Sequence, residues 1–278
     1  MATPARELPG KILLYGILIA GVVITVFPFF WMFVLATLSR REIFGFPPEL
    51  WFGEYAAQNM QNLLGYVPFL RNMWNSFYIA SMATITALFF CSLAAFGFAM
   101  YDFKFKRTLF IIMISTLMIP PVLTIIPWFI LMRFFGWVNA PRALWLPGMA
   151  NAFGIFLLKQ YIESAVPKDF MDAGRIDGCT EFRIYRSIIL PVITPGLGAL
   201  GMITFINNWN NFLQALIILR DRTAYTIPVA LSSLQGMIST DYGAVMFGTA
   251  MSTLPILIAF IFFSNRIIEG LTAGAVKG

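Results

Sequence analysis

Long apolar stretches alternate with short polar ones along almost the whole chain. Most of the apolar stretches are long enough to cross a bilayer as a helix. Six of them are expected to span, at about 12–36, 77–98, 109–132, 143–158, 195–219 and 244–263. The pattern therefore predicts an all-α polytopic membrane protein with six transmembrane helices, in which residues 1–278 form a single domain.

Prolines and small residues refine this pattern. Pro120-Pro121 predicts a break or kink in the third stretch, because neither proline can donate a backbone hydrogen bond. Asn75-Ser76 is expected to open the second stretch, whose many Ala, Ser and Gly residues suit close helix packing in lipid. Pro120-Pro121 and Pro255 either mark gating breaks or only shape the packing, and the sequence leaves both interpretations open.

The most polar interruption lies between the fourth and fifth stretches, at about residues 161–191. It predicts a helix, a glycine turn and a second helix: Pro167 can open the first, Gly178 suits a left-handed stop, and Thr180 can cap the second. Three apolar residues of the second helix recur at helical spacing, Phe182, Tyr185 and Ile189. An apolar stripe on a helical hairpin in water can dock into the groove of a partner.

Composition supports a membrane protein and excludes several kinds of chemistry. The 278 residues are 59% hydrophobic and 12% charged, against about 25% charged residues in soluble domains. The net charge of +6 does not indicate nucleic-acid binding, because basic residues that flank the spans account for it. The chain has no His, and its two cysteines, Cys91 and Cys179, suggest neither a disulfide nor a metal site.

The basic residues also predict an orientation. With the N-terminus inside, twelve of the nineteen Lys and Arg residues fall on the inner side and seven on the outer side. Both termini and the 161–191 loop are then expected to be cytoplasmic, with the larger loops 37–71 and 220–243 outside.

No motif for ATP binding or catalysis is visible. Gly10-Lys11 is followed by Ile12 and lacks the glycine that a Walker motif requires. No Asp, Glu, Lys or Arg lies in the middle of a predicted span, which weighs against a proton-driven secondary transporter. The chain is therefore expected to be neither an ATPase nor an enzyme, and to bind no cofactor itself.

Polar groups do occur late in the fifth stretch. They are a run of amides beside an aromatic side chain, Asn207, Trp209, Asn210, Asn211 and Gln214. Amides and aromatic faces suit a sugar, so these residues are candidates for a substrate pathway, with Asn207, Asn211 and Gln214 expected on one helical face. The alternatives are amides that hold helices together and a Trp209 that anchors the helix at the membrane interface.

The polar loop carries a spaced motif, Asp172-Ala173-Gly174, then Asp177-Gly178, then Ile188-Ile189-Leu190-Pro191. This motif resembles the EAA loop of ABC importer permeases, roughly Glu-Ala-Ala, Asp-Gly and Ile-x-Leu-Pro. In that family the loop is the coupling helix that sits in a cleft of the cytoplasmic ATPase. The resemblance implies an ATPase-coupling role for Asp172, Ala173, Gly174, Asp177, Gly178, Ile188, Leu190 and Pro191, whereas an ordinary charged loop is the alternative.

This chain departs from the family motif at three positions. Asp172 stands for Glu and keeps the charge, and Cys179 stands for the usual Ala. Gly174 stands for Ala and should loosen the first helix by about 1 kcal/mol.

Other stretches are similar to carbohydrate-importer permeases of the maltose type. They are Trp209-Asn210-Asn211-Phe212, the opening of the second stretch at 69–76, and the C-terminal tail 270–278. The resemblance implies that the tail contacts the ATPase, with Gly274 and Lys277 as candidates. The match is weaker in the first outer loop, where the family's usual Asn-Tyr is Asn59-Met60.

The resemblance implies the type I ABC importer permease fold in the cytoplasmic membrane of a bacterium or archaeon. It also implies a second homologous permease, two copies of an ATPase that binds ATP and Mg, an extracytoplasmic solute-binding protein on the outer loops, and a sugar as substrate. Transport would follow alternating access driven by ATP hydrolysis on the partner subunits. Maltodextrins, other oligosaccharides and glycerol phosphate stay open as substrates.

Two other functions compete with this interpretation. An ABC permease for a non-sugar solute would share the coupling loop, but the tail and Trp209-Asn210 argue against it. An ion-coupled secondary transporter would need neither the loop nor an ATPase.

Overall fold

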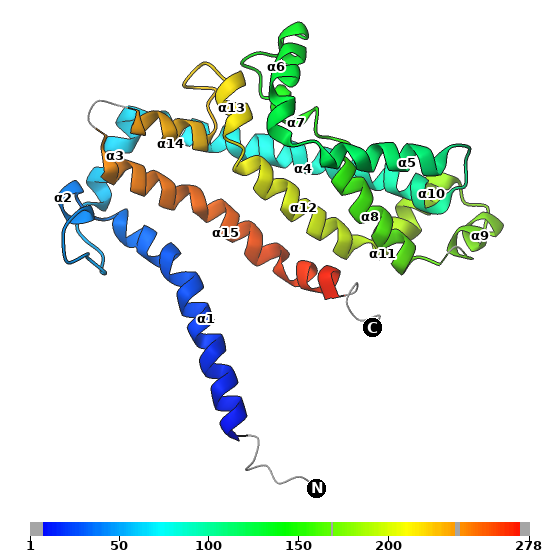
Figure 1. The fold of residues 1–278 in the computed structure, drawn as a ribbon, viewed down its shortest axis with the longest axis horizontal. Helices are drawn as coiled ribbons and strands as arrows, with labels where there is room; N and C mark the ends of the chain where they lie inside the picture. Colours follow the sequence, from blue (N-terminus) through cyan, green and yellow to red (C-terminus); the bar gives the residue numbers. More distant parts are fainter. Residues whose placement is uncertain (1–7, 168, 237–239, 273–278) are drawn as a thin grey trace. The chain divides into compact units, whose positions relative to one another are not determined.

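The computed structural model describes residues 8–167, 169–236 and 240–272, and within them the side chains of 10–167, 169–236 and 240–261. Every regular element in these ranges is helical, which confirms the all-α prediction (Figure 1). The longer helices are α1 (Leu8–Leu35), α3 (Ala56–Tyr66), α4 (Phe69–Met100), α5 (Lys106–Ser115), α6 (Ile125–Phe134), α8 (Ala152–Ala165), α9 (Asp169–Ile176), α12 (Thr194–Trp209), α14 (Ile227–Gln235) and α15 (Tyr242–Thr272). The shorter ones are α2 (Arg40–Ile43), η2 (Thr116–Met118), η3 (Pro121–Thr124), α7 (Arg142–Trp145), α10 (Glu181–Ile184), η4 (Tyr185–Ile189), α11 (Leu190–Val192) and α13 (Leu213–Ile218).

The chain forms two compact units, residues 1–69 with 231–253, and residues 70–230 with 254–278. In the first unit, buried Asn59 of α3 joins two chain segments. Its Nδ2 donates to the carbonyl oxygens of Ala36 and Leu38, at 2.9 Å each. A buried amide is stable in such a place only when it is hydrogen-bonded, so Asn59 fixes the turn that follows α1.

The core of the second unit forms where α4 crosses α8 and the segment after α9. Small residues of α4 are fully buried there, among them Ala87, Cys91 and Ala95. Leu158 and Ile162 of α8 pack into the same cluster. The small side chains let the helix backbones approach closely, as the Ala, Ser and Gly content of this stretch predicted.

Three predicted spans are single helices. α1, α4 and α15 are each long and apolar enough to cross a membrane. The third is broken, because residues 106–118 and 121–134 meet at 97°. The break lies at Pro120-Pro121, as predicted, whereas Pro255 lies inside the continuous α15.

The boundaries predicted for the fourth and fifth spans are wrong. The fourth prediction, 143–158, covers most of α7, a turn and only the first half of α8. α8 itself has 14 residues, about 21 Å at 1.5 Å per residue, which is shorter than the hydrocarbon core. The fifth is divided into α12 and α13. Among the described residues, three helices and two bent pairs meet the length and hydropathy requirements of a span.

The start of the second span is also corrected. α4 begins at Phe69, so Asn75 and Ser76 lie inside the helix. Both are buried and bind the chain around residues 222–227: Asn75 Nδ2 donates to the carbonyl oxygen of Thr223 at 2.8 Å, and Ser76 Oγ accepts from Ile227 N at 2.8 Å. These polar residues fasten a loop to the helix, which is why they occur before the apolar run.

Candidate functional site

In the segment from α9 to α12, the turn has the structure that the sequence predicted. α9 ends before Gly178, whose φ of +74° is the left-handed conformation that glycine adopts without strain. The amide of Cys179 donates to the carbonyl oxygen of Gly174 at 2.9 Å and closes the turn. Thr180 then caps α10, its side chain accepting from the amide of Arg183.

After this cap, residues 181–192 form one helical rod that meets α12 at 79°. The rod contains a π-helical turn at Tyr185–Ile189, and Pro191 lies in its last turn. Ile188 and Leu190 are half-buried, and Pro191 is exposed. π-helical turns recur at functional sites, and here the turn lies just before the bend that leads into α12.

The predicted apolar stripe of the rod packs mainly within this chain. Tyr185 and Ile189 are buried, and the Tyr185 hydroxyl lies 2.7 Å from the hydroxyl of Ser92 on α4. Phe182 differs from them, because its side chain is 58% exposed. The expectation that all three residues form one docking stripe is therefore wrong: two of them anchor the rod to α4.

A different apolar surface faces outward around the turn. Phe170 is 42% exposed, Ile176 86% and Phe182 58%. Asp172, Ala173 and Asp177 of the motif are exposed beside them. We call the three apolar residues and these three motif residues the turn surface. A mixture of exposed apolar and acidic groups on a short hairpin suits a protein partner.

One carboxylate holds this hairpin to the end of α4. Glu181 Oε1 accepts from Arg175 Nε of α9 at 2.9 Å, and its Oε2 accepts from the Tyr101 hydroxyl. The hydrogen bond from Arg175 is the main reason that the pKa of Glu181 lies below its ordinary value. Burial, followed by the bond to Glu181, raises the pKa of Tyr101 to about 12.

α9 approaches the rod closely at Gly174. A Cβ atom at this position would lie 2.9 Å from Cγ1 of Ile184 and 3.2 Å from Cδ1 of Ile188. Ile184 is fully buried and branched at Cβ, so it has little freedom to move aside. The glycine therefore allows tight packing, which the expected cost in helix propensity did not anticipate.

The predicted amide face of the fifth span does not exist as one face. α12 ends at Trp209 and α13 begins at Leu213, so Asn207 lies on α12 and Gln214 on α13. Asn211, in the break, donates from Nδ2 to Gln214 Oε1 at 2.7 Å, and Asn210 is exposed. Trp209 is buried and stacks on Phe205, 5.8 Å between ring centroids.

Asn207 lines a cavity of about 400 Å³ between α12, α4 and the chain around the start of α8. Other polar groups at its wall are Trp145, Asn151, Thr204 and Asn208. Asn151 also caps α8, its Oδ1 accepting from Gly154 N at 2.7 Å. The Trp145 indole N–H is buried and has no partner among the described residues. An unpaired buried donor favours a ligand or water that can accept from it.

Sequence reasoning missed Trp145, Asn151 and Thr204 as members of this site. Their one signal is polarity within the predicted apolar stretches 143–158 and 195–219, which does not reveal that three chain segments meet. The proposed tail residues Gly274 and Lys277 lie outside the described residues. Within the described part of the chain, no three His, Cys, Asp or Glu residues are grouped to hold a metal ion.

Residues 87–269 match the family described as binding-protein-dependent transport system inner membrane component. The chain belongs to this family. The permease is 35% identical over 277 residues to the lactose transport system permease protein of Rhizobium radiobacter, covering 100% of both chains. It is 32% identical over 280 residues to the trehalose/maltose transport system permease protein of Thermococcus litoralis, covering 98% of this chain and 99% of that one.

The fold of the permease resembles that of a solved structure. It superposes with a TM-score of 0.82 on a chain of a bacterial ABC transporter involved in the import of the acidic polysaccharide alginate, at 18% identity, covering 96% of this chain and 99% of that one. The type I permease fold and the function of a membrane subunit of a binding-protein-dependent importer are thus confirmed.

Proposed function

We propose that this permease forms half of the translocation pathway of an ABC importer for a sugar or oligosaccharide. The other half is a second, homologous permease, and an extracytoplasmic binding protein delivers the substrate. Two copies of a cytoplasmic ATPase bind ATP and Mg and drive the cycle, while this chain makes no covalent change to the substrate. Both termini are cytoplasmic in this arrangement.

The observation that carries the proposed coupling is that the exposed turn surface lies on a segment whose other side packs against the core. Gly174, Tyr185 and Ile189 fix the hairpin to the core, while Phe170, Ile176 and Phe182 stay exposed. Because the segment is closely packed, a displacement that the ATPase imposes on this surface is transmitted through the rod and its bend to α12. The motif residues thus divide into an exposed group, Asp172, Ala173, Asp177, Gly178 and Pro191, and a packed group, Gly174, Ile188 and Leu190.

The proposed substrate class rests on the chemistry of the 400 Å³ cavity. Its wall combines the indole of Trp145 with the amides of Asn151, Asn207 and Asn208 and carries no charged side chain. Amides can donate to and accept from sugar hydroxyls, and an aromatic face covers the C–H side of a sugar ring. The sugars named for the two relatives agree with a neutral, hydroxylated substrate. A phosphorylated substrate finds no cation here.

Co-purification tests the assembly. An affinity tag on this chain, followed by mass spectrometry, should recover a P-loop ATPase and a second permease from native membranes. Recovery of this chain alone, still active in transport, would instead support the secondary-carrier function.

Transport by the reconstituted complex tests the turn surface and the cavity that Asn207 lines separately. Ile176→Ser should reduce ATP-driven uptake and its coupling to hydrolysis, whereas Phe134→Ser, a similarly exposed apolar residue on α6, should not. Asn207→Ala should lower kcat/KM for uptake by about tenfold, the value of one hydrogen bond to the substrate.

Asn210→Ala is the control for the cavity, because Asn210 is exposed like Asn207 but lies outside the cavity wall. Labelled lactose, maltose and glycerol phosphate serve as probes. Equal uptake by the Asn207 and Asn210 variants would remove the cavity from the pathway, and uptake of glycerol phosphate alone would exclude the proposed substrate class.

A further inference from the structure

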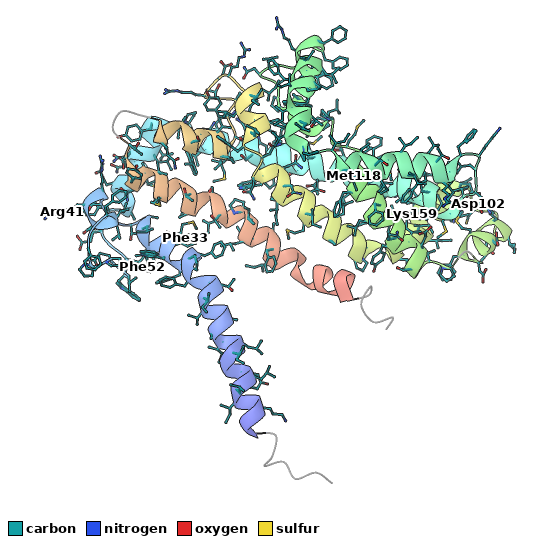
Figure 2. The ribbon with its side chains drawn as sticks, in the orientation of Figure 1. Phe33, Arg41, Phe52, Asp102, Met118 and Lys159 are labelled. Carbon is teal, nitrogen blue, oxygen red and sulfur yellow. The ribbon has the colours of Figure 1, made fainter. Side chains whose placement is uncertain are left out.

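A second polar cavity lies at the corner where α4 ends and α5 begins. Its volume is about 520 Å³, and its wall includes Asp102, Lys106, Arg107 and, from α8, Lys159. Asp102 and Lys159 are labelled at this corner in Figure 2. The corner adjoins the hairpin of the turn surface, because Tyr101 binds Glu181 there. Neither the turn surface nor the cavity that Asn207 lines includes these residues.

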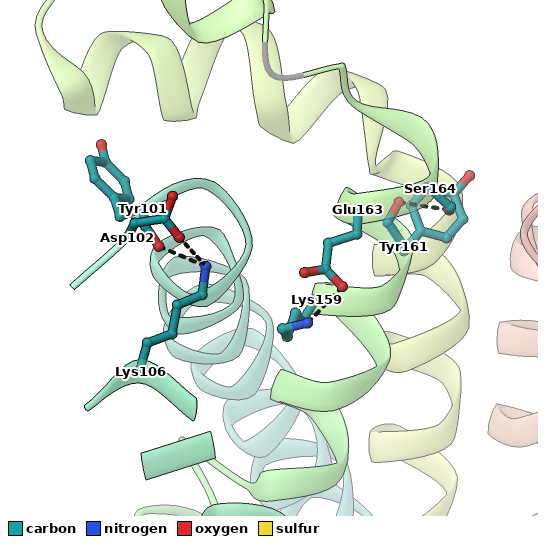
Figure 3. A network of polar contacts seen from close by, with 7 residues as sticks. All are labelled: Tyr101, Asp102, Lys106, Lys159, Tyr161, Glu163 and Ser164. Carbon is teal, nitrogen blue, oxygen red and sulfur yellow. Dashed lines mark hydrogen bonds and ion pairs between the residues drawn. The ribbon is translucent and has the colours of Figure 1, made fainter. Parts of the chain in front are cut away.

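The two lysines are held in place by hydrogen bonds (Figure 3). Lys106 Nζ donates to the Tyr101 carbonyl oxygen at 2.8 Å and lies 3.2 Å from Asp102. Lys159 Nζ lies 2.6 Å from Glu163 and 4.7 Å from the centroid of the Phe110 ring. Each ammonium has three N–H donors, so these contacts leave donors for an additional acceptor.

Arg107 supplies positive charge that no acid among the described residues offsets. Asp102 and Glu163 each pair with one lysine, whereas the exposed guanidinium of Arg107 has no ion pair within the described ranges. A guanidinium is suited to bidentate binding of phosphate. The cavity therefore favours an anion over a neutral ligand.

Thr108 and four phenylalanine rings form the rest of the wall. The rings are Phe98, Phe103, Phe105 and Phe110. Phe103 is 42% exposed and Phe105 64%, and Phe105 is presented from a left-handed backbone with φ of +67°. Four apolar rings add no favourable contact for a soluble phosphate. A lipid, in contrast, needs apolar contacts for its acyl chains beside cations for its headgroup.

We propose that this corner binds the headgroup and upper acyl chains of an anionic phospholipid such as phosphatidylglycerol. α4 has 32 residues, about 48 Å at 1.5 Å per residue, and exceeds the hydrocarbon core, so its end reaches the headgroup layer. Basic pockets between helices at this depth bind anionic headgroups. The bound lipid contacts the helix end that Glu181 joins to the turn surface, and it thereby stabilises that junction.

Lipid binding to the purified complex in an uncharged detergent tests the proposal. Native mass spectrometry would follow titration with dioleoyl phosphatidylglycerol, dioleoyl phosphatidylcholine and inorganic phosphate. We expect phosphatidylglycerol to bind at least about tenfold more tightly than phosphatidylcholine, and Arg107→Gln with Lys159→Gln to remove most of that preference. Arg71→Gln with Arg133→Gln is the control, because both residues are exposed and lie outside the cavity wall.

A second variant tests the apolar half of the cavity. Phe103→Ser with Phe105→Asn removes two rings, and Asn tolerates the left-handed backbone at position 105. It should weaken phosphatidylglycerol without changing phosphate binding. Equal affinity for the two lipids, an unchanged Arg107→Gln single variant, or phosphate that displaces the lipid at equal concentration would overturn the proposal. These readouts measure binding alone, so they hold whatever solute the importer carries.

Discussion

At the scale of single residues, Glu181 holds the hairpin of the turn surface to the end of α4. It accepts from Arg175 of α9 and from Tyr101 at the end of α4. The two acceptor oxygens thus join three segments. A motif search overlooks this residue, because Arg175 and Tyr101 become its partners only through the turn at Gly178 and the crossing of α4.

We expect this junction to weaken at both ends of the pH scale. Because the pKa of Glu181 is lowered, its contribution is present above the ordinary value of 4.5 and is lost as the pH falls below it. Because the pKa of Tyr101 is raised to about 12, its contribution is complete below 10 and is lost between 10 and 12. Amide exchange in α9 should accelerate in both ranges.

The Glu181→Gln variant isolates the acidic effect. Its exchange in α9 should already be faster than that of the wild type at neutral pH and should show no further step below 4.5. An unchanged step in this variant would assign the acidic transition to another carboxylate.

Gly174 provides a second residue-scale prediction. Gly174→Leu forces a side chain against buried Ile184 and should destabilise the protein by about 1–3 kcal/mol, the usual cost of overpacking. Ala173→Leu, one residue earlier on the same helix but exposed, should change stability by less than about 0.5 kcal/mol. Denaturant unfolding in detergent measures both; equal effects would contradict the packing at Gly174.

At the scale of elements, polar side chains of α4 determine the path of the loop before α14. Asn72 Nδ2 donates to the carbonyl oxygens of Arg222 and Tyr225 at 2.8 and 3.0 Å. Asn75 Nδ2 does the same for Thr223 and Tyr225 at 2.8 and 3.0 Å. A loop fastened at three neighbouring carbonyls presents a fixed surface, which suits its predicted role outside the membrane.

Removing one of these amides should loosen the loop. Asn75→Ala removes the donor to the carbonyl oxygens of Thr223 and Tyr225, at a cost of about 0.5–1.5 kcal/mol, the usual net value of a hydrogen bond. Trypsin should then cleave after Arg220 and Arg222 several-fold faster in the folded protein. Asn210→Ala is the matched control, because its amide is exposed. Cleavage at the wild-type rate in Asn75→Ala would show that other contacts hold the loop.

Elements also determine which substitutions can test coupling. Gly178→Pro would change the turn itself, because proline holds φ near −65° and Gly178 requires +74°. Ala173→Lys changes only the exposed face of α9. Of the two, Ala173→Lys is the informative substitution: lost coupling would reflect the partner interface and not the hairpin.

At the scale of the whole molecule, orientation in the membrane is the main prediction still to be tested. An impermeant maleimide should label Leu50→Cys in right-side-out vesicles and Asp177→Cys only in inverted ones. Both positions are exposed, and Cys179→Ser provides the background, with native Cys91 buried. Labelling of Asp177→Cys from the outside would reverse the topology and exclude a cytoplasmic coupling surface.

The sequence alone determined the class, the helical content and the turn at Gly178. Apolar stretches of sufficient length require helices in lipid, because the backbone must satisfy its own hydrogen bonds there. Pro120-Pro121 and Gly178 act within their own few residues, so their break and turn were predictable. The spaced motif likewise indicated the family before any tertiary contact was known.

Only the tertiary structure decided which side chains meet. The break of α12 before α13 contains no proline, and it moves Asn207 and Gln214 onto different helices. Tyr185 and Ile189 turn inward because α4 offers small residues to pack against, which leaves Phe170, Ile176 and Phe182 as the outward face. Helical spacing shows that residues share a face, but it cannot show which neighbour covers that face, because burial depends on segments far away in the chain.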